Sequence, residues 1–150
     1  WYYSSQGRLP ANTNGNAYSN AIMMGHVRKI RWTDDGWPVV MPERYAAVPD
    51  VSITEEELMG TWENITLKYD AGKQQASGTL TLASNHTATG ALSGAWSWDA
   101  GKKILTIGTQ KLYVEREADW EASPRKHTLV YAGLNQSGES LWGKRVQSTN

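Results

Sequence analysis

Acidic side chains are the residues of this 150-residue chain best suited to chemistry. A glycosidase needs two carboxyl groups beside the scissile bond, one as acid and the other as base or nucleophile. Asp34 and Asp35 stand in a predicted turn, Glu43 follows them, and Glu115 and Glu117 share one face of a predicted strand. No catalytic constellation stands out among them, so we assign no catalytic residue.

Motifs for other chemistry are missing from the sequence. It contains no Gly-rich phosphate loop, no Gly-X-Ser-X-Gly elbow and no Cys. His26, His86 and His127 are scattered, and none lies four residues from a second metal ligand. We therefore assign no metal ligand, and we expect His86 to be solvated in a hairpin turn.

The aromatic content is unusual, with eight Trp, seven Tyr and no Phe. Trp and Tyr combine an apolar face with a hydrogen-bonding edge, so they can stack on sugar rings. The same rings can fill the core of a β-barrel, and composition leaves both roles open. Trp96 and Trp98 are predicted to lie on one face of a strand, which suits either a platform for substrate or a core.

Charge and hydropathy narrow the classes of partner. Fifteen basic and fifteen acidic side chains cancel, which gives no electrostatic case for nucleic acid or an anionic membrane. No run approaches the roughly 18 apolar residues that a membrane span requires. We expect neither partner.

The elements that would position these side chains fall into two parts, and the first is a small sheet. Residues 1–9, 22–32 and 37–41 are predicted strands, and residues 10–20 form a loop rich in Asn, Gly and Ser. Three such strands make one sheet or an incomplete propeller blade, which is too small to be stable alone. Trp1 opens within a strand, so we expect a cut within a longer protein and a missing partner.

The second part, from residue 60 onward, has an entirely β pattern. Turn residues separate seven predicted strands: 61–69, 77–83, 88–98, 103–108, 111–117, 127–134 and 140–146. Seven or eight short, evenly spaced strands favour a closed up-and-down antiparallel barrel, which has no exposed edges. The predicted fold class is all-β.

A short helix and a Trp motif precede the first barrel strand. Residues 54–57 fit a capping box, and Gly60 limits the helix to a turn or two. Gly60-Thr61-Trp62 resembles the Gly-X-Trp signature of lipocalin-type barrels. That resemblance implies a Trp packed across the closed end of the barrel beneath a basic residue of the last strand, Lys144 or Arg145.

Residues 26–45 combine a strand, an Asp35-Gly36 turn and a Trp37-Pro38 exit. Together with Gln6-Gly7-Arg8, this segment resembles the end of the catalytic domain of glycoside hydrolase family 43 enzymes, in particular the endo-1,5-α-L-arabinanases. The resemblance implies that residues 1–48 are the closing strands of a five-bladed β-propeller with a linker. It implies a C-terminal β-barrel accessory domain over residues 49–150.

The same resemblance implies a function for the complete enzyme. That function is hydrolysis of α-1,5 links in arabinan with inversion, by an acid and a base across a wide carboxyl gap. The family's catalytic carboxylates come from earlier blades, outside this chain. The implied partners are the N-terminal propeller portion of the same enzyme and arabinan or arabino-oligosaccharide, in a secreted or periplasmic bacterial protein. This chain would close and stabilise the propeller.

Two features of the first strand bear on the site. Family members often place a His before the Gln-Gly-Arg segment, and a His near the propeller axis holds calcium; here that position is Ser5. The resemblance therefore implies calcium only in the complete propeller. Gln6 and Arg8 would line the central cavity as substrate-binding residues, or else belong to a packed final strand with a solvated Arg.

Two further functions remain open from the sequence. A non-catalytic carbohydrate-binding module would stack arabinan on exposed rings such as Trp96, Trp98 or Trp120. A lipocalin-like carrier would hold a small apolar ligand inside the barrel.

Overall fold

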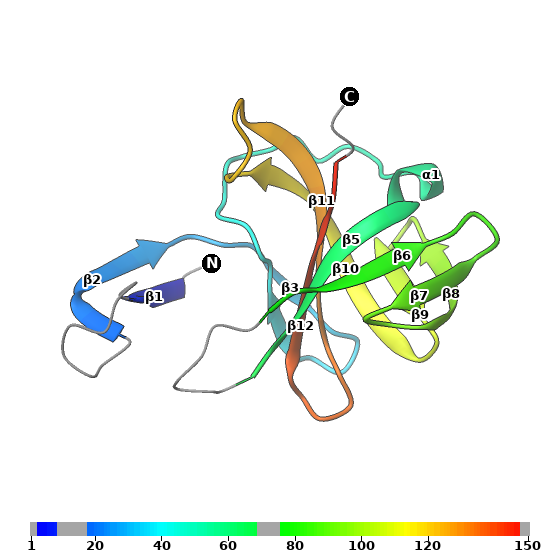
Figure 1. The fold of residues 1–150 in the computed structure, drawn as a ribbon, viewed down its shortest axis with the longest axis horizontal. Helices are drawn as coiled ribbons and strands as arrows, with labels where there is room; N and C mark the ends of the chain where they lie inside the picture. The colour runs from blue at the N-terminus through cyan, green and yellow to red at the C-terminus, as the bar shows by residue number, and fades with distance from the viewer. Residues whose placement is uncertain (1–2, 9–17, 69–75, 148–150) are drawn as a thin grey trace.

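The part of the chain that the structure describes forms a closed eight-stranded β-barrel preceded by two short hairpins (Figure 1). This computed structural model describes residues 3–8, 18–68 and 76–147, with side chains from residue 25 onward. The hairpins consist of β1 (Tyr3–Arg8), β2 (Tyr18–His26), β3 (Ile30–Trp32) and β4 (Pro38–Val40). The barrel consists of β5 (Gly60–Leu67), β6 (Gly78–Leu82), β7 (Thr87–Gly90), β8 (Gly94–Asp99), β9 (Ile104–Ile107), β10 (Gln110–Asp119), β11 (Lys126–Leu134) and β12 (Ser140–Arg145). The all-β prediction and the barrel are confirmed.

Neighbouring barrel strands are antiparallel and follow the order β10-β11-β12-β5-β6-β7-β8-β9. β9 pairs with β10 and closes the ring, so no barrel strand keeps an open edge. The strand predicted over residues 88–98 is wrong, because the chain reverses there and forms β7 and β8. Gly90 permits this reversal: its φ is 103°, and a Cβ would lie 2.1 Å from the Thr79 carbonyl oxygen.

Large side chains fill the inside of the barrel. Those that are fully buried there include Trp62, Tyr131, Leu80, Leu82, Leu105, Leu112 and Val114. The Trp62 and Tyr131 ring centroids lie 5.3 Å apart, and the Tyr131 hydroxyl donates to Asn64 Oδ1 at 2.6 Å. Gly143 is the strand partner of Tyr131, and a Cβ there would lie 2.1 Å from the Tyr131 ring. The ring therefore occupies the space that a side chain at 143 would need.

One end of the barrel is closed by α1 (Glu55–Leu58), the one helix among the described residues. The Thr54 N–H donates to the Glu57 carboxylate at 3.0 Å, as the capping-box prediction requires. The Trp62 indole N–H donates to the Leu58 carbonyl at 2.8 Å, which ties the helix to β5. None of the described residues forms a helix long and apolar enough to cross a membrane.

The basic residue over this end is Arg145. It pairs with Trp62 across β5 and β12, and its guanidinium donates to the Met59 carbonyl at 2.6 Å. Of the two candidates named from the Gly-X-Trp motif, Arg145 therefore has the expected position. Lys144 points to the opposite face of β12.

The prediction of one three-stranded sheet before residue 42 is wrong. β1 and β2 form one two-stranded sheet, and β3 and β4 form another. The segment predicted as a strand over residues 22–32 is interrupted between β2 and β3, where the chain bonds to the segment after β4 instead. There the Met41 N–H donates to the Lys29 carbonyl at 2.9 Å and the Tyr45 N–H to the Val27 carbonyl at 2.8 Å. Trp1, Leu9 and residues 10–17 of the predicted loop lie outside the described residues, and residues 18–20 of that loop instead belong to β2.

Candidate functional site

A strap made of residues 27–50 crosses the outer face of β10, β11 and β12 (Figure 1). β4 provides its apolar contact: Val39 and Met41 are 3% and 0% exposed. They pack on outward-facing side chains of the barrel, namely Ile104, Tyr113, Val130 and Ala132. Both faces of β10 and β11 are thus buried, the inner one in the barrel and the outer one beneath the strap.

Ion pairs hold the strap at the middle of β10. Glu115, which is 8% exposed, accepts from Arg31 at 2.6 Å and from Lys29 at 3.1 Å. The Arg31 guanidinium also donates to the Lys102 carbonyl at 2.8 Å and lies over the Tyr113 ring. Both oxygens of the Glu115 carboxylate therefore accept hydrogen bonds from cations of the strap.

Glu117 lies on the same outer face and is 3% exposed. The Glu43 N–H donates to its Oε2 at 3.1 Å, while its Oε1 is buried without a hydrogen-bond partner among the described residues. Burial raises the pKa of Glu117 to about 7. Such a pKa is typical of an acid–base group, but Glu117 lies beneath the strap and faces no substrate-sized pocket.

The end of the strap is held by Lys144 and by two indoles. Lys144 donates to Glu43 at 2.9 Å and to Asp119 and Glu121 at 2.8 Å each. Burial alone would lower the pKa of Lys144, but these carboxylates raise it well above its usual value. Two indole N–H groups add bonds to strap carbonyls: Trp142 to Val40 at 2.7 Å and Trp120 to Arg44 at 2.8 Å.

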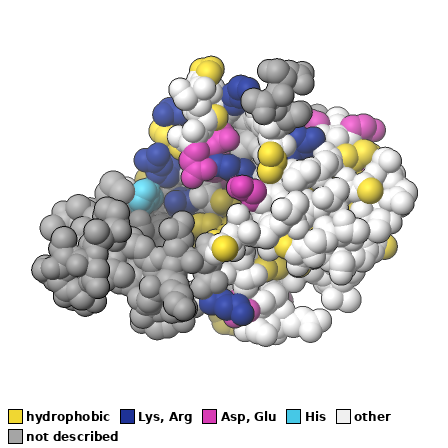
Figure 2. Space-filling model, viewed as in Figure 1, with side chains coloured by type: hydrophobic (Ala, Val, Ile, Leu, Met, Phe, Trp, Pro, Cys, Tyr) yellow, Lys and Arg dark blue, Asp and Glu magenta, His cyan; other side chains and the backbone are white. Residues whose placement is uncertain are grey.

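Acidic and basic side chains lie side by side over the upper part of the barrel on the face that Figure 2 shows. Among the described residues, no group of three or more His, Asp or Glu side chains is arranged to hold a metal ion. Three carboxylates of the strap, those of Asp34, Glu43 and Asp50, pair with lysines of the barrel and help to anchor the strap.

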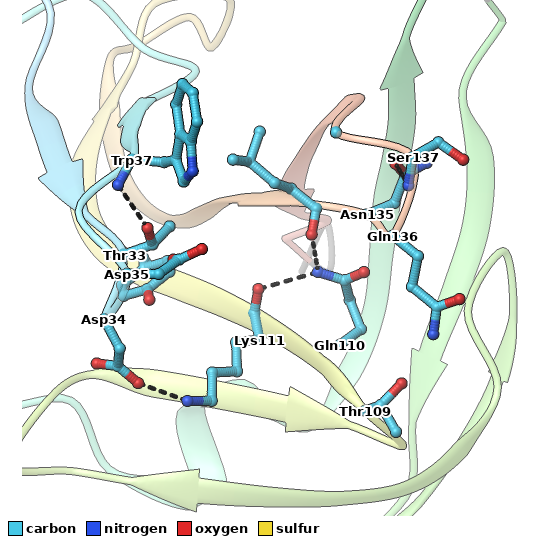
Figure 3. A pocket seen from close by; sticks show the side chains of 13 residues that line it. Thr33, Asp34, Asp35, Trp37, Thr109, Gln110, Lys111, Asn135, Gln136 and Ser137 are labelled. Atoms are coloured by element: carbon cyan, nitrogen blue, oxygen red, sulfur yellow. Dashed lines mark hydrogen bonds and ion pairs between the residues drawn. The ribbon is translucent and has the colours of Figure 1, made fainter.

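A pocket of about 850 Å³ lies where three turns meet (Figure 3). These regions are residues 33–37 between β3 and β4, residues 109–111 at the turn from β9 into the start of β10, and residues 134–138 from the end of β11 into the turn before β12. Trp37 stands on one side with 63% of its side chain exposed, and Gln136 stands on the other. The pocket is an open concave surface bordered by polar side chains of the strap and of the barrel.

The walls of the pocket are held by their own hydrogen bonds. The Gln110 amide donates to the Leu134 carbonyl at 2.7 Å, which joins two of the turns. Asn135 Oδ1 accepts from the Ser137 and Glu139 N–H groups at 3.0 and 2.9 Å. Lys111 forms an ion pair with Asp34 and lowers the pKa of the Asp34 carboxyl.

Trp96 and Trp98, two of the four residues predicted to bind substrate, do not line this pocket. Trp96 is 2% exposed inside the barrel, and its indole donates to the Ala83 carbonyl at 3.0 Å. Trp98 packs against the core and donates to the Ile53 carbonyl at 3.3 Å. The side chains of Gln6 and Arg8 lie outside the described residues. Substrate binding by these four residues stays a prediction.

Trp37 is the aromatic side chain that the sequence reasoning passed over. Its signal was the Asp-Gly-Trp-Pro order, because a Trp between a tight turn and a proline is kept extended at the hairpin tip. The neighbouring Trp32 is 64% exposed on the outward face of the same hairpin. The third ring named in advance, Trp120, lies under the Arg44 and Arg125 guanidinium groups, 4.4 and 3.8 Å from the ring centroid.

The amino-acid sequence of this chain is similar to one protein family and to two characterised proteins. A family model, GH43_C, described as a C-terminal lipocalin-like domain, matches residues 42–143. The chain is 28% identical over 122 residues to extracellular endo-α-(1→5)-L-arabinanase 2 of Bacillus subtilis strain 168, a match to 79% of this chain and 26% of that protein. It is also 28% identical over 126 residues to the extracellular endo-α-(1→5)-L-arabinanase of Thermotoga petrophila, over 81% of this chain and 27% of that protein.

Solved structures show the same fold. The crystal structure of the Thermotoga petrophila RKU-1 endo-1,5-α-L-arabinanase in complex with TRIS superposes with a TM-score of 0.70 and 22% identity, over 97% of this chain and 32% of that one. The glycoside hydrolase family 43 protein YxiA of Bacillus licheniformis gives a TM-score of 0.67 and 23% identity, over 84% of this chain and 29% of that one. The chain spans about a quarter of the length of the curated relatives that it matches.

Proposed function

Since this chain belongs to the glycoside hydrolase family 43 group of C-terminal lipocalin-like domains, we propose that it is the C-terminal part of an enzyme that cleaves α-1,5-linked L-arabinan. Both curated relatives are named extracellular arabinanases, which supports this substrate and a bacterial protein that is secreted. The catalytic carboxylates lie outside this chain and act with inversion. Calcium, if the enzyme needs it, is bound by the propeller.

The role of this chain is to support the catalytic propeller. The observation that carries this proposal is the hairpin β3–β4, which is buried on one face and open on the other. Val39 faces the barrel and is 3% exposed, whereas Trp32 faces outward and is 64% exposed. Val39 and Arg31 anchor the hairpin to the barrel, so Trp32 is presented on a rigid support. The propeller portion of the same polypeptide packs against this outward face of the hairpin and covers Trp32.

The carboxylates of the chain agree with a supporting role. Glu115 and Glu117 are buried under the strap, and Glu43, which lines a surface pocket of about 750 Å³, is bonded to Lys144. All three carboxylates are thus held by contacts between the strap and the barrel. A buried and bonded carboxylate cannot reach a glycosidic oxygen, which general acid catalysis requires.

The test compares the isolated 150-residue chain with the full-length polypeptide that contains it. On debranched arabinan, the full-length protein should release arabino-oligosaccharides and the chain alone should release none. In the full-length protein, Trp32→Ala should lower the temperature of half-inactivation while the KM for arabinan stays within about twofold. Hydrolysis by the chain alone, or a full-length protein that is inactive on arabinan, would contradict the proposal.

Of the two other functions, the small-ligand carrier has no support in the structure, because aromatic and leucine side chains occupy the barrel interior. A carbohydrate-binding role has a specific observation in its favour, the exposed Trp37 in the pocket between the turns.

A further inference from the structure

We infer that the pocket between residues 33–37, 109–111 and 134–138 binds an uncharged oligosaccharide, with Trp37 as the platform on which a sugar ring stacks. Nothing in the supporting role of the barrel requires such a site. The inference comes from one exposed ring, the polar groups opposite it and the charge of the pocket.

The Trp37 ring is exposed, and the backbone that carries it is held in place. The Thr33 N–H donates to the Trp37 carbonyl at 2.8 Å, and the Trp37 N–H donates to Thr33 Oγ1 at 2.8 Å. Gly36, with φ of 85°, completes the tight turn. Because the backbone is already ordered, a ligand that stacks on the ring pays no entropy to order this turn, which favours binding.

Three polar groups of the pocket are available to a ligand, one in the same turn as Trp37 and two across the pocket from it. Within the described part of the chain, the side chains of Asp35, Thr109 and Gln136 make no hydrogen bond, although all three line the pocket. A carboxylate accepts two hydrogen bonds side by side, and an amide both donates and accepts. This combination matches neighbouring sugar hydroxyls, each of which is both donor and acceptor.

The charge of the pocket selects against other ligands. Lys111 is already paired with Asp34, so Asp35 leaves the surface slightly negative and unsuited to phosphates or acidic sugars. An apolar ligand would leave the amide and hydroxyl groups of the lining without hydrogen-bond partners, whereas a sugar offers a hydroxyl to each. The pocket volume of about 850 Å³ falls within the range of small-ligand sites, roughly 300–1,000 Å³.

The choice of arabinan as the probe sugar rests on the proposed function. The pocket opens on the side of the hairpin where Trp37 lies, while Trp32 lies on its outward face. The site would therefore hold a polysaccharide chain beside the surface that meets the propeller, and would keep substrate near the enzyme.

The experiment is isothermal titration of the 150-residue chain with linear arabinohexaose, and with cellohexaose and xylohexaose for comparison. Affinity electrophoresis in gels that contain debranched arabinan gives a second readout. Trp37→Ala should weaken binding about tenfold or more, the equivalent of 1.4 kcal/mol. Gln136→Ala should weaken it severalfold. Since the ligand is uncharged, affinity should change less than twofold between 50 and 500 mM NaCl, a range in which ionic contacts are strongly screened.

Trp32→Ala is the matched control, because Trp32 lies in the same hairpin and is equally exposed but does not line the pocket. It should leave the affinity unchanged. Absence of binding to all three oligosaccharides and to arabinan would overturn the inference, and so would equal losses in the two Trp variants or strong weakening by salt. Binding of cellohexaose or xylohexaose alone would uphold the pocket and count against arabinan as the substrate. If the full-length protein hydrolyses arabinan but the 150-residue chain does not bind it, the inferred binding site is wrong and the proposed function is unaffected.

Discussion

Arg31 and Glu115 are 84 residues apart in the sequence and form an ion pair of 2.6 Å on the outer face of the barrel. The pair joins the centre of β3 to the centre of β10, and Lys29 approaches the same carboxylate at 3.1 Å. Glu115 is thereby neutralised at a site that is largely shielded from water. The strap and the barrel are, in consequence, one folding unit on this side of the molecule.

Replacement of Glu115 tests the strap anchor. Glu115→Gln removes the charge that compensates Arg31 and Lys29, so we expect the free energy of unfolding to fall by about 2 kcal/mol. Urea denaturation followed by fluorescence measures this change, and trypsin should cut within residues 27–50 sooner than in the wild type. Asp34→Asn is the control, since Asp34 and Lys111 are about half exposed and their solvent-screened pair should contribute little to stability. Equal effects of the two variants would contradict the anchoring role.

Gly143 is predicted to tolerate no side chain. Gly143→Ala places a methyl group 2.1 Å from the Tyr131 ring, which is itself bonded to Asn64 and cannot move freely. We expect a loss of about 3 kcal/mol or more, through overpacking of the barrel interior. Thermal unfolding measured by circular dichroism checks this. Gly101→Ala should change stability by less than ~0.5 kcal/mol, because the nearest atom to its Cβ is 3.5 Å away; a Gly143→Ala protein as stable as this control would refute the packing account.

Glu117 should make stability depend on pH. Its pKa is about 7 in the folded chain and near 4.5 when unfolded, so between these values the folded state keeps a proton that the unfolded state releases. Stability contributed by this group is therefore present below pH 4.5 and is lost as the pH rises towards 7, by about 3 kcal/mol in total. Glu117→Gln mimics the protonated form. We expect it to be more stable than the wild type at pH 8 and similar at pH 4.5, in urea denaturation at both values.

Glu63→Gln supplies the comparison for Glu117, because Glu63 is an exposed carboxylate on β5, a barrel strand that does not pair with β10. Its stability should follow that of the wild type across the whole pH range. A Glu117→Gln protein that also follows the wild type would show that Glu117 titrates normally.

Lys144 should matter most at neutral pH. Burial would raise the pKa of Asp119, but the hydrogen bond from Lys144 lowers it, so this pair stabilises the fold above the unfolded pKa and loses its effect as acid protonates Asp119. Lys144→Met should therefore destabilise the chain by about 2 kcal/mol at pH 7 and by clearly less near pH 3. Lys68→Met, at an exposed pair of 3.9 Å, should cost less than ~0.5 kcal/mol at either pH. A loss that is independent of pH would assign Lys144 a packing role only.

The barrel was predictable because its signals are local. Turn residues and alternation locate the strands, and Gly60-Thr61-Trp62 marks the first of them. The sequence does not predict the break between β7 and β8, because Gly90 and Gly94 fall within an otherwise continuous strand pattern. In the structure their positive φ values bend the chain. Nothing local distinguishes these glycines from others in a strand.

The strap was not predictable in the same way, because it depends on contacts between distant segments. No short-range pattern tells that Arg31 meets Glu115, or that Val40 accepts a hydrogen bond from Trp142. One signal existed: residues 129–132 are apolar at every position, which indicates a strand covered on both faces. Trp37 likewise gained its meaning only when the turns on either side of it were placed in space.

Domains are exchanged between genes most readily when the boundary between them separates little apolar contact surface. In this chain the suitable boundary does not lie directly before the first barrel strand, because Val39 and Met41 of the strap cover the outward side chains of β10 and β11. A recombination event that transferred residues 49–150 alone would omit Val39 and Met41 and expose Tyr113 and Val130 to solvent. Inheritance of the barrel as a transferable cassette thus requires the β3–β4 hairpin to travel with it.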